Sequence, residues 1–223
     1  MAKLLPVNFR KSQETAVATY NYTDIASGTG FVIFYAGKLA DSNVLSSFTF
    51  YSDNVLEPTA ALTATTYTLL NDDDYDVMFN TPRAIEGNAI ITVPMGMYPT
   101  ANDKNVTLKA TVTIRKWDGT TETDIATNDG VFEINGASSA TLYTKMTAID
   151  ITVPRTSFKA GETLRLTIAF YGKVETAGNS KVWYGHDPKS RPTTDEELAA
   201  SANYTFSTDP SILEFHCPFK LDL

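Results

Sequence analysis

The sequence predicts an all-β protein, a single antiparallel β-sandwich with a jelly-roll-like arrangement of about eight to ten strands. Three observations support this fold class. β-Branched and aromatic residues dominate the chain, helical periodicity is nearly absent, and apolar and polar residues alternate with a period of two in several segments. Because such alternation buries one face of a strand and leaves the other in water, it is typical of antiparallel sheets packed face to face.

At the N-terminal end, residues 1–30 form a long polar stretch before the first strong strand. We expect this stretch to be an arm that orders on a neighbouring subunit. The strand over 30–39 is apolar on both faces between Phe31 and Tyr35, which indicates either a central strand or an interface. Residues 31–223 contain no repeat and no linker, so one β-sandwich domain is predicted there. Further strands are expected over 44–52, 66–70, 75–79 and 89–98.

The middle of the chain shows the clearest alternation, over residues 106–117. Asp118-Gly119 follows this segment and predicts a tight hairpin back along 120–126. Two further turns are predicted at Asn128–Gly130 and Asn135–Gly136. The predicted inward face of the first strand consists of Val106, Leu108, Ala110, Val112 and Ile114.

A strand over 140–153 should end at Pro154, and a corner over 157–162 should lead into the next strand. In this corner Phe158 should pack beneath the connection, and Gly161 should supply a positive φ angle. The prolines expected at other strand ends are Pro58, Pro82 and Pro99.

Two more alternating strands cover 163–172 and 213–223. The loop between them, 185–202, holds one helical signal, the capping-box spacing of Thr194 and Glu197. His216 should lie on the polar face of the last strand. The predicted core positions are Leu164, Leu166, Ile168 and Phe170 in the first strand and Leu213, Phe215, Cys217, Phe219 and Leu221 in the second.

The overall charge and the single cysteine exclude several classes of protein. The net charge of −8 and the pI of about 4.7 are opposite to those of a general nucleic-acid binder, which needs basic residues to neutralise phosphates. One cysteine, Cys217, cannot form a disulfide framework, and we expect it to be a small core residue. No apolar signal region and no membrane-spanning run is found, so synthesis in a reducing cytoplasm without membrane contact is expected.

Three motifs that could carry chemistry are incomplete. Asp72, Asp74 and Asp76 have the spacing of the start of a calcium loop, but the glycine and the closing glutamate are missing, so a solvated loop is favoured. His186 and His216 have no accompanying cysteine or glutamate cluster for zinc, and no nucleophile elbow is present. The glycines of 26–30 lack the lysine of a phosphate loop. We therefore predict no catalytic residue, no cofactor and no metal.

Four aromatic residues fall near strand ends or in loops, where we expect exposure: Trp117, Tyr171, Trp183 and Tyr184. Aromatic platforms of this kind stack on sugar rings or anchor protein interfaces. Three alternatives stay open for them, namely half-buried rim residues, subunit contacts and sugar contacts.

Several phrases of the chain together resemble a group of uncharacterised proteins encoded by tailed phages and environmental viruses. They are "YNYTDIASGTGFVIFYAG", "FNTPRAIEGNAIITV", "SFKAGETLRLTIAFYG", "GHDP" and "FHCPFKLDL". The resemblance spans most of the chain, but none of the phrases is a catalytic motif. It implies a virion structural protein associated with the capsid or the tail.

The sequence thus predicts a non-enzymatic virion protein that decorates or cements a phage capsid. Its expected partners are further copies of itself, with a trimer as the first expectation, and other virion proteins such as the major capsid protein. A glycan-binding module of a tail or fibre is the alternative, because exposed aromatics at the end of a sandwich permit it. A hydrolase is poorly supported, since no acid–base pair stands out.

Overall fold

The computed structural model describes residues 29–40, 42–58, 62–99, 101–102, 104–139, 141–175, 180–191 and 211–220. In these residues the all-β prediction is confirmed, because they form eleven strands and no helix. The predicted arm, up to residue 28, and the capping box of Thr194 lie outside them. The strands are β1 (Thr29–Leu39), β2 (Ser42–Ser46), β3 (Leu56–Pro58), β4 (Thr68–Met78), β5 (Arg83–Pro99), β6 (Lys104–Trp117), β7 (Glu122–Ala137), β8 (Tyr143–Phe158), β9 (Thr163–Val174), β10 (Ser180–Gly185) and β11 (Leu213–Lys220).

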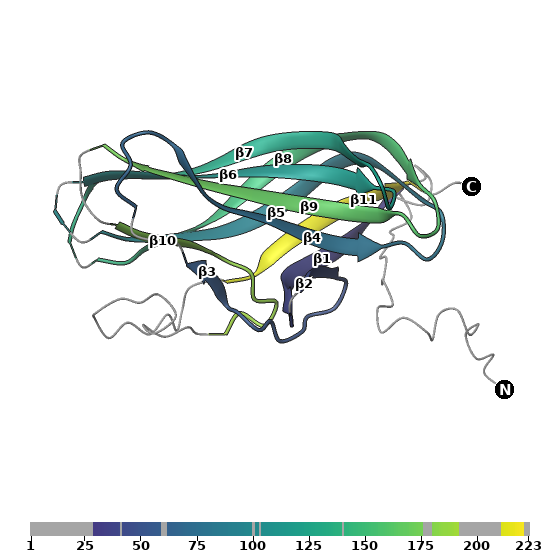
Figure 1. Ribbon diagram of the computed structural model, residues 1–223, viewed down its shortest axis with the longest axis horizontal. Helices are drawn as coiled ribbons and strands as arrows, with labels where there is room; N and C mark the ends of the chain where they lie inside the picture. Colours follow the sequence, from purple (N-terminus) through teal and green to yellow (C-terminus); the bar gives the residue numbers. More distant parts are fainter. Residues whose placement is uncertain are drawn as a thin grey trace.

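All eleven strands belong to one curled sheet (Figure 1). Its order is β3-β10-β5-β11-β1-β2-β4-β9-β6-β7, and β8 pairs with the free side of β5. The prediction of a purely antiparallel sheet is wrong at one point, because β2 and β4 pair in parallel at Val44 and Asp76. The number of strands also exceeds the prediction, since β3 and β10 were not expected.

The curl of the sheet produces two layers that enclose one core. The β4–β9–β6–β7 layer and the β8–β5–β11–β1 layer both contribute side chains to a single apolar cluster. The predicted inward positions of β6, β9 and β11 are buried there, Cys217 included, and the predicted core residue Leu221 lies outside the described residues. Because burying one large aliphatic or aromatic side chain stabilises a fold by about 1.5–3 kcal/mol, this alternation is the main source of stability. Among the described residues, no helix is long and apolar enough to cross a membrane.

The two outermost strands of the curl, β7 and β8, lie side by side without forming a ladder. The Asn128 side chain donates to the Asp150 carbonyl (2.7 Å), and Lys145 donates to the Val131 carbonyl (3.3 Å). Gly130 permits this approach, because a Cβ there would lie 2.6 Å from a side-chain carbon of Ile149. The predicted turns at 128–130 and 135–136 are therefore wrong, since both dipeptides lie within β7.

The predicted hairpin and corner are both present. The Asp118 carboxylate accepts from the backbone amides of Thr120 (2.9 Å) and Thr121 (2.7 Å), which closes the turn between β6 and β7. In the corner, Phe158 is buried and Gly161 has a φ of +89°, a conformation that L side chains rarely adopt. Pro154, predicted to end a strand, instead lies within β8 at a β-bulge against β5.

Glu162 fixes this corner through its carboxylate. One oxygen, Oε2, contacts Lys116 Nζ (2.6 Å) and accepts from the Lys159 backbone amide (2.7 Å). The hydrogen bond from Lys116 and the one from Lys159 hold the pKa of Glu162 below its ordinary value. A carboxylate with a lowered folded-state pKa stabilises the fold above its unfolded-state pKa, and this stabilisation is lost as the pH falls through the folded-state value.

We therefore expect Glu162→Gln to remove part of the acid sensitivity of the protein. Urea denaturation at pH 7 and at pH 3 should show a larger fall in the free energy of unfolding for the wild type than for the variant. Glu133→Gln, on the exposed part of β7, is the matched control and should behave like the wild type. An equal fall in wild type and Glu162→Gln would show that this carboxylate has no such role.

Candidate functional site

The four aromatic residues proposed for contacts do not lie together. Trp117 at the end of β6 and Tyr171 in β9 are half-buried, and both lie on the outer surface of the β4–β9–β6–β7 layer. Trp183 and Tyr184, on β10, are buried, so the expectation that they are exposed is wrong. Trp183 packs in a small satellite cluster with Val55, Leu56 and Tyr98, whereas Tyr184 belongs to the main core.

The outer surface of the β4–β9–β6–β7 layer, called here the charged face, is ordered by strand register. One cross-strand row runs Asp76, Arg165, Arg115, Asp124, and another runs Leu69, Tyr171, Lys109, Val131. Small residues, mainly threonines, occupy the rows between them on β9 and β6. The charged face therefore has an arginine–carboxylate end and a lysine–tyrosine end.

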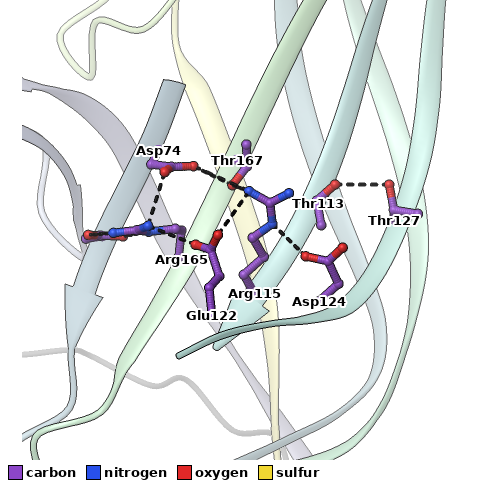
Figure 2. A network of polar contacts seen from close by, with 9 residues as sticks. Asp74, Thr113, Arg115, Glu122, Asp124, Thr127, Arg165 and Thr167 are labelled. Atoms are coloured by element: carbon purple, nitrogen blue, oxygen red, sulfur yellow. Dashed lines mark hydrogen bonds and ion pairs between the residues drawn. The ribbon is translucent and has the colours of Figure 1, made fainter. Parts of the chain in front are cut away.

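Arg165 is the centre of the first end (Figure 2). Its guanidinium donates through Nε and Nη2 to the two carboxylate oxygens of Asp76, both at 2.8 Å, and through Nη1 to Glu122 at 2.8 Å. The hydrogen bonds from this group to Asp76 raise the pKa of Arg165. The guanidinium also lies 5.7 Å from the centroid of the Trp117 ring, which explains why Trp117 is half-buried.

Arg115 extends this network toward β7 (Figure 2). It donates through Nε to Asp124 (2.7 Å) and through Nη1 to the Thr167 hydroxyl (3.0 Å). Thr167 in turn donates to Asp74 at 2.5 Å. Two guanidinium groups thus face the four carboxylates of Asp74, Asp76, Glu122 and Asp124, which leaves this end negatively charged.

The acidic run 71–76 lies in a strand and not in the solvated loop that the sequence predicted. It is not a loop between two short strands, because β4 is continuous from Thr68 to Met78. Asp74 and Asp76 point to the charged face and bind arginines, whereas Asp73 points into the protein. Among the described residues, no group of three or more His, Cys, Asp or Glu is arranged to hold a metal ion. The available signal for a strand in this run was the aromatic residue Tyr75.

The lysine–tyrosine end of the charged face combines the exposed Tyr67 ring and the half-buried Tyr171 ring with two lysines, of which Lys109 also pairs with Asp129 (3.3 Å). Lys109 Nζ lies 4.8 Å from the Tyr171 centroid and 5.4 Å from that of Tyr67, and Lys173 Nζ lies 5.0 Å from the Tyr67 centroid. Leu69 and Val131, at the two ends of the same row, are exposed. This end is a surface on which a planar or anionic group could rest.

The opposite outer surface, on the β8–β5–β11–β1 layer, is mostly apolar at its centre. We call six of its residues the β1 face: Phe31, Ile33, Tyr35, Ile90, Glu214 and His216. Phe31, Ile33 and Ile90 are 44%, 37% and 43% exposed. Strand β1 pairs with β11 along Thr29–Ala36, whereas β2 pairs only with Tyr35–Leu39. The expectation of a central strand is therefore met only at Tyr35 and Ala36, where β1 pairs on both sides, and the expectation of an interface stays a prediction.

The polar part of the β1 face is small. His216 Nε2 lies 3.0 Å from Glu214 Oε2, on the polar side of β11 as predicted. Partial burial and the nearby Glu214 carboxylate raise the pKa of Tyr35. Apart from this group, the centre of the face consists of aliphatic and aromatic carbon.

A buried polar cluster joins β4 and β10 inside the protein. The Tyr75 and Tyr184 hydroxyls are 3.0 Å apart, and Tyr184 donates to Asp73 Oδ2. Burial is the main cause of the strongly raised pKa of Tyr184. The ring of His186 packs against both tyrosines, with centroids 6.1 Å and 5.8 Å away. These are the residues with the most catalytic character, but Tyr75, Tyr184 and His186 are buried.

Comparison with known protein families gives no match, and neither does comparison with curated proteins. Comparison with solved structures gives several matches. An aminopeptidase from a marine sediment archaeon, a thaumarchaeote, is 5% identical over 87% of this chain and 37% of its own, with a TM-score of 0.52. A CocE/NonD family hydrolase from Staphylococcus aureus is 13% identical over 86% and 37%, with a TM-score of 0.47.

A third similar structure is the VP2 subviral particle of infectious bursal disease virus, 11% identical over 83% of this chain and 45% of that one, with a TM-score of 0.33. The chain spans less than half the length of each of these three proteins. At these identities the likeness to the aminopeptidase concerns the β fold alone.

Proposed function

We propose that this protein is a non-enzymatic virion structural protein of a tailed phage, a capsid decoration or cement component that acts through protein–protein contacts. The observation that carries this proposal is the β1 face, where Phe31, Ile33 and Ile90 stay exposed on one outer surface of the sheet. Exposed apolar side chains that gather on a rigid sheet are typical of interaction sites. We also propose that the two layers follow a jelly-roll-like sandwich arrangement.

The burial of the polar cluster supports a non-enzymatic role. His186 and Tyr184 are buried, and Asp187 beside them is held by Arg191, whose backbone amide (2.7 Å) and Nε (3.0 Å) donate to its carboxylate. At most 1% of Tyr75, Tyr184 and His186 is exposed, so these three residues are closed to a substrate in this structure. We assign the hydrogen-bonded group of Tyr75, Tyr184 and Asp73 to the stability of the fold, where polar networks fix one packing.

The test of this function is the composition of the particle. Virions that carry the gene are purified on a density gradient, and their proteins are quantified by mass spectrometry. We expect peptides of this chain at a fixed ratio to the major capsid protein in intact particles. Recovery of the chain only from the particle-free fractions of the lysate would reject the proposal.

A glycan-binding role is the second candidate, favoured by the lysine–tyrosine end of the charged face. Tyr67 and Tyr171 offer rings beside two lysines, which suits a sugar that carries an acidic group. If the chain is a structural protein, it should bind no glycan on an array, and Tyr171→Ala should give the same result as the wild type.

Trp117→Ala is the matched control for this array, because Trp117 lies at the other end of the same face. A signal that is lost in Tyr171→Ala and kept in Trp117→Ala would favour the glycan-binding role. Trp183, which sequence reasoning would have chosen for substitution, is buried and unsuitable for this purpose.

A further inference from the structure

The first half of β1 has one open edge. Strand β11 pairs with β1 along Thr29–Ala36, whereas β2, on the other side, pairs only with Tyr35–Leu39. Among the residues that the structure describes, no strand pairs with 29–34 on the β2 side. An unpaired edge of this kind is a template for another extended segment, because its amides and carbonyls already have strand geometry.

The direction of the backbone groups along β1 follows from the bonds of Lys38. Its amide donates to Ser52 Oγ (2.9 Å), and its carbonyl accepts from the Asp53 amide (2.8 Å). Because β2 occupies the other side of Lys38, these groups point away from β2. Backbone groups alternate in direction along a strand, so those of the odd-numbered residues of β1 point toward the β2 side.

Phe31 and Ile33 are therefore the residues whose amides and carbonyls face the open edge. Pro218, opposite Phe31 on β11, agrees with this direction, because proline has no N–H to exchange with Phe31. The side chains of Phe31 and Ile33 are exposed on the outer surface, whereas Val32 and Phe34 are buried. A strand that fills the edge should thus be polar on its outer side and apolar or aromatic on its core side.

The chain itself contains a segment of this kind directly before β1. Residues 20–25, "YNYTDI", are rich in tyrosine, threonine and isoleucine, which favour strands. Residues 26–28 separate this segment from Thr29 and end in Gly28, which suits the left-handed position of a three-residue hairpin loop. The segment has the same number of residues as the open edge 29–34.

We infer that residues 20–25 pair antiparallel with residues 29–34 of the same chain and close the open edge of β1. The short loop selects this occupant, because a tethered segment has an effective concentration in the millimolar range beside the edge. It also selects the antiparallel direction, since a parallel strand needs a crossover of about a dozen residues or more. The inference goes beyond the proposed virion role and does not rest on it. For these residues it differs from the expectation that 1–30 order on a neighbouring subunit.

The register that the loop sets agrees with the two surfaces of β1. Thr23 comes opposite Phe31, and Asn21 comes opposite Ile33, which places polar side chains on the outer surface. The two tyrosines of the segment alternate with them and lie on the core side. A shift by one residue would exchange these two sets, so the loop length and the alternation support the same pairing.

Disulfide formation in the full chain tests this register. In a hydrogen-bonded antiparallel pair the Cα atoms are about 5.5 Å apart, which suits a disulfide. Thr23→Cys combined with Phe31→Cys should therefore close within one chain under mild oxidation, as identified by peptide mass spectrometry. The native Cys217 does not interfere, because it is buried and burial raises the pKa of its thiol.

The matched control for the disulfide is Tyr22→Cys combined with Phe31→Cys. Its two side chains lie on opposite surfaces of the inferred pair, so it should stay reduced. Equal yields in the two double variants would show that residues 20–25 have no fixed register. That result, or a disulfide of Thr23→Cys with Phe31→Cys that joins two chains, would overturn the inference.

Amide hydrogen exchange of the isotope-labelled full chain, followed by NMR, is an independent test. We expect slow exchange at Phe31 and Ile33 in the wild type. Asn21→Pro combined with Thr23→Pro should speed it by about tenfold or more, because proline removes the amides that pair with β1. Fast exchange at both residues in the wild type, or protection that persists in this double variant, would overturn the inference.

Two controls separate loss of the pairing from general unfolding. Val32, whose amide points to β11, should exchange slowly in every variant. Thr15→Pro combined with Val17→Pro, outside the segment, should leave Phe31 protected. A last mixture, unlabelled wild type with the labelled Asn21→Pro and Thr23→Pro variant, should restore no protection. Restored protection would assign the edge to the N-terminal segment of a second copy and would reject pairing within one chain.

Discussion

Trp183→Ala is expected to lower the free energy of unfolding by about 3–5 kcal/mol, the usual cost of truncating a buried aromatic side chain. Trp183 is 3% exposed and packs with Val55, Leu56 and Tyr98 on the outer side of β10. Its ring also lies over Gly96 of β5, where a Cβ would be 2.3 Å from the indole. The variant therefore loses the satellite core and uncovers a strand glycine.

The matched control for this substitution is Trp117→Ala, because the chain has only two tryptophans. Trp117 is half-buried and contacts Arg165 from the surface, so its loss should cost no more than about 1 kcal/mol. Urea denaturation followed by far-UV circular dichroism measures both variants. Equal losses of stability would contradict the assignment of Trp183 to a core.

Tyr184→Phe should lower the free energy of unfolding by about 1–3 kcal/mol, although it removes a single oxygen. The Tyr184 hydroxyl contacts Tyr75 (3.0 Å) and donates to Asp73, and both tyrosines are fully buried. Without it, Asp73 and Tyr75 each lose a hydrogen-bond partner, and Tyr75 is buried. For a domain of this size the melting temperature should fall by roughly 2–4 °C for each kcal/mol.

The control for Tyr184→Phe is Tyr171→Phe, a tyrosine of the half-buried outer surface. Its melting temperature should stay within about 1–2 °C of the wild type. A double-mutant cycle of Tyr184→Phe with Asp73→Asn then measures the coupling between the two side chains. A coupling energy of zero would show that the buried hydrogen bond does not stabilise the fold.

The fold class and most core faces could be predicted because they depend on local alternation. Val106 to Ile114 in β6 and Leu164 to Phe170 in β9 are buried at every second position, as the period of two requires. The corner at Gly161 could also be predicted from the sequence, because a positive φ angle strongly favours glycine.

Features that depend on distant contacts could not be predicted. Asn128–Gly130 has the composition of a turn, yet Gly130 serves a close approach of β7 to Ile149 in β8. Pro154 occupies a bulge that exists only because β5 and β8 change register there. The parallel contact of Val44 with Asp76 depends on how the whole sheet curls, which no local pattern encodes.

The candidate surfaces also differ in how far the sequence could predict them. Sequence reasoning identified the unusual apolar strand at Phe31–Tyr35, because both faces of that segment are visibly apolar. It missed the arginine–carboxylate network, since Arg165 and Asp76 are far apart in the chain and meet only through strand register. It also placed Trp183 and Tyr184 on the surface, because β10 has flanks that resemble a loop.

A cryo-electron microscopy map of the virion that carries this gene tests the central claim most directly. We predict density for this chain at regular positions on the particle, with Phe31, Ile33 and Ile90 enclosed in a protein–protein contact. A particle that lacks the chain, or one in which these three side chains face solvent, would contradict the claim that the protein works as a building block through its β1 face.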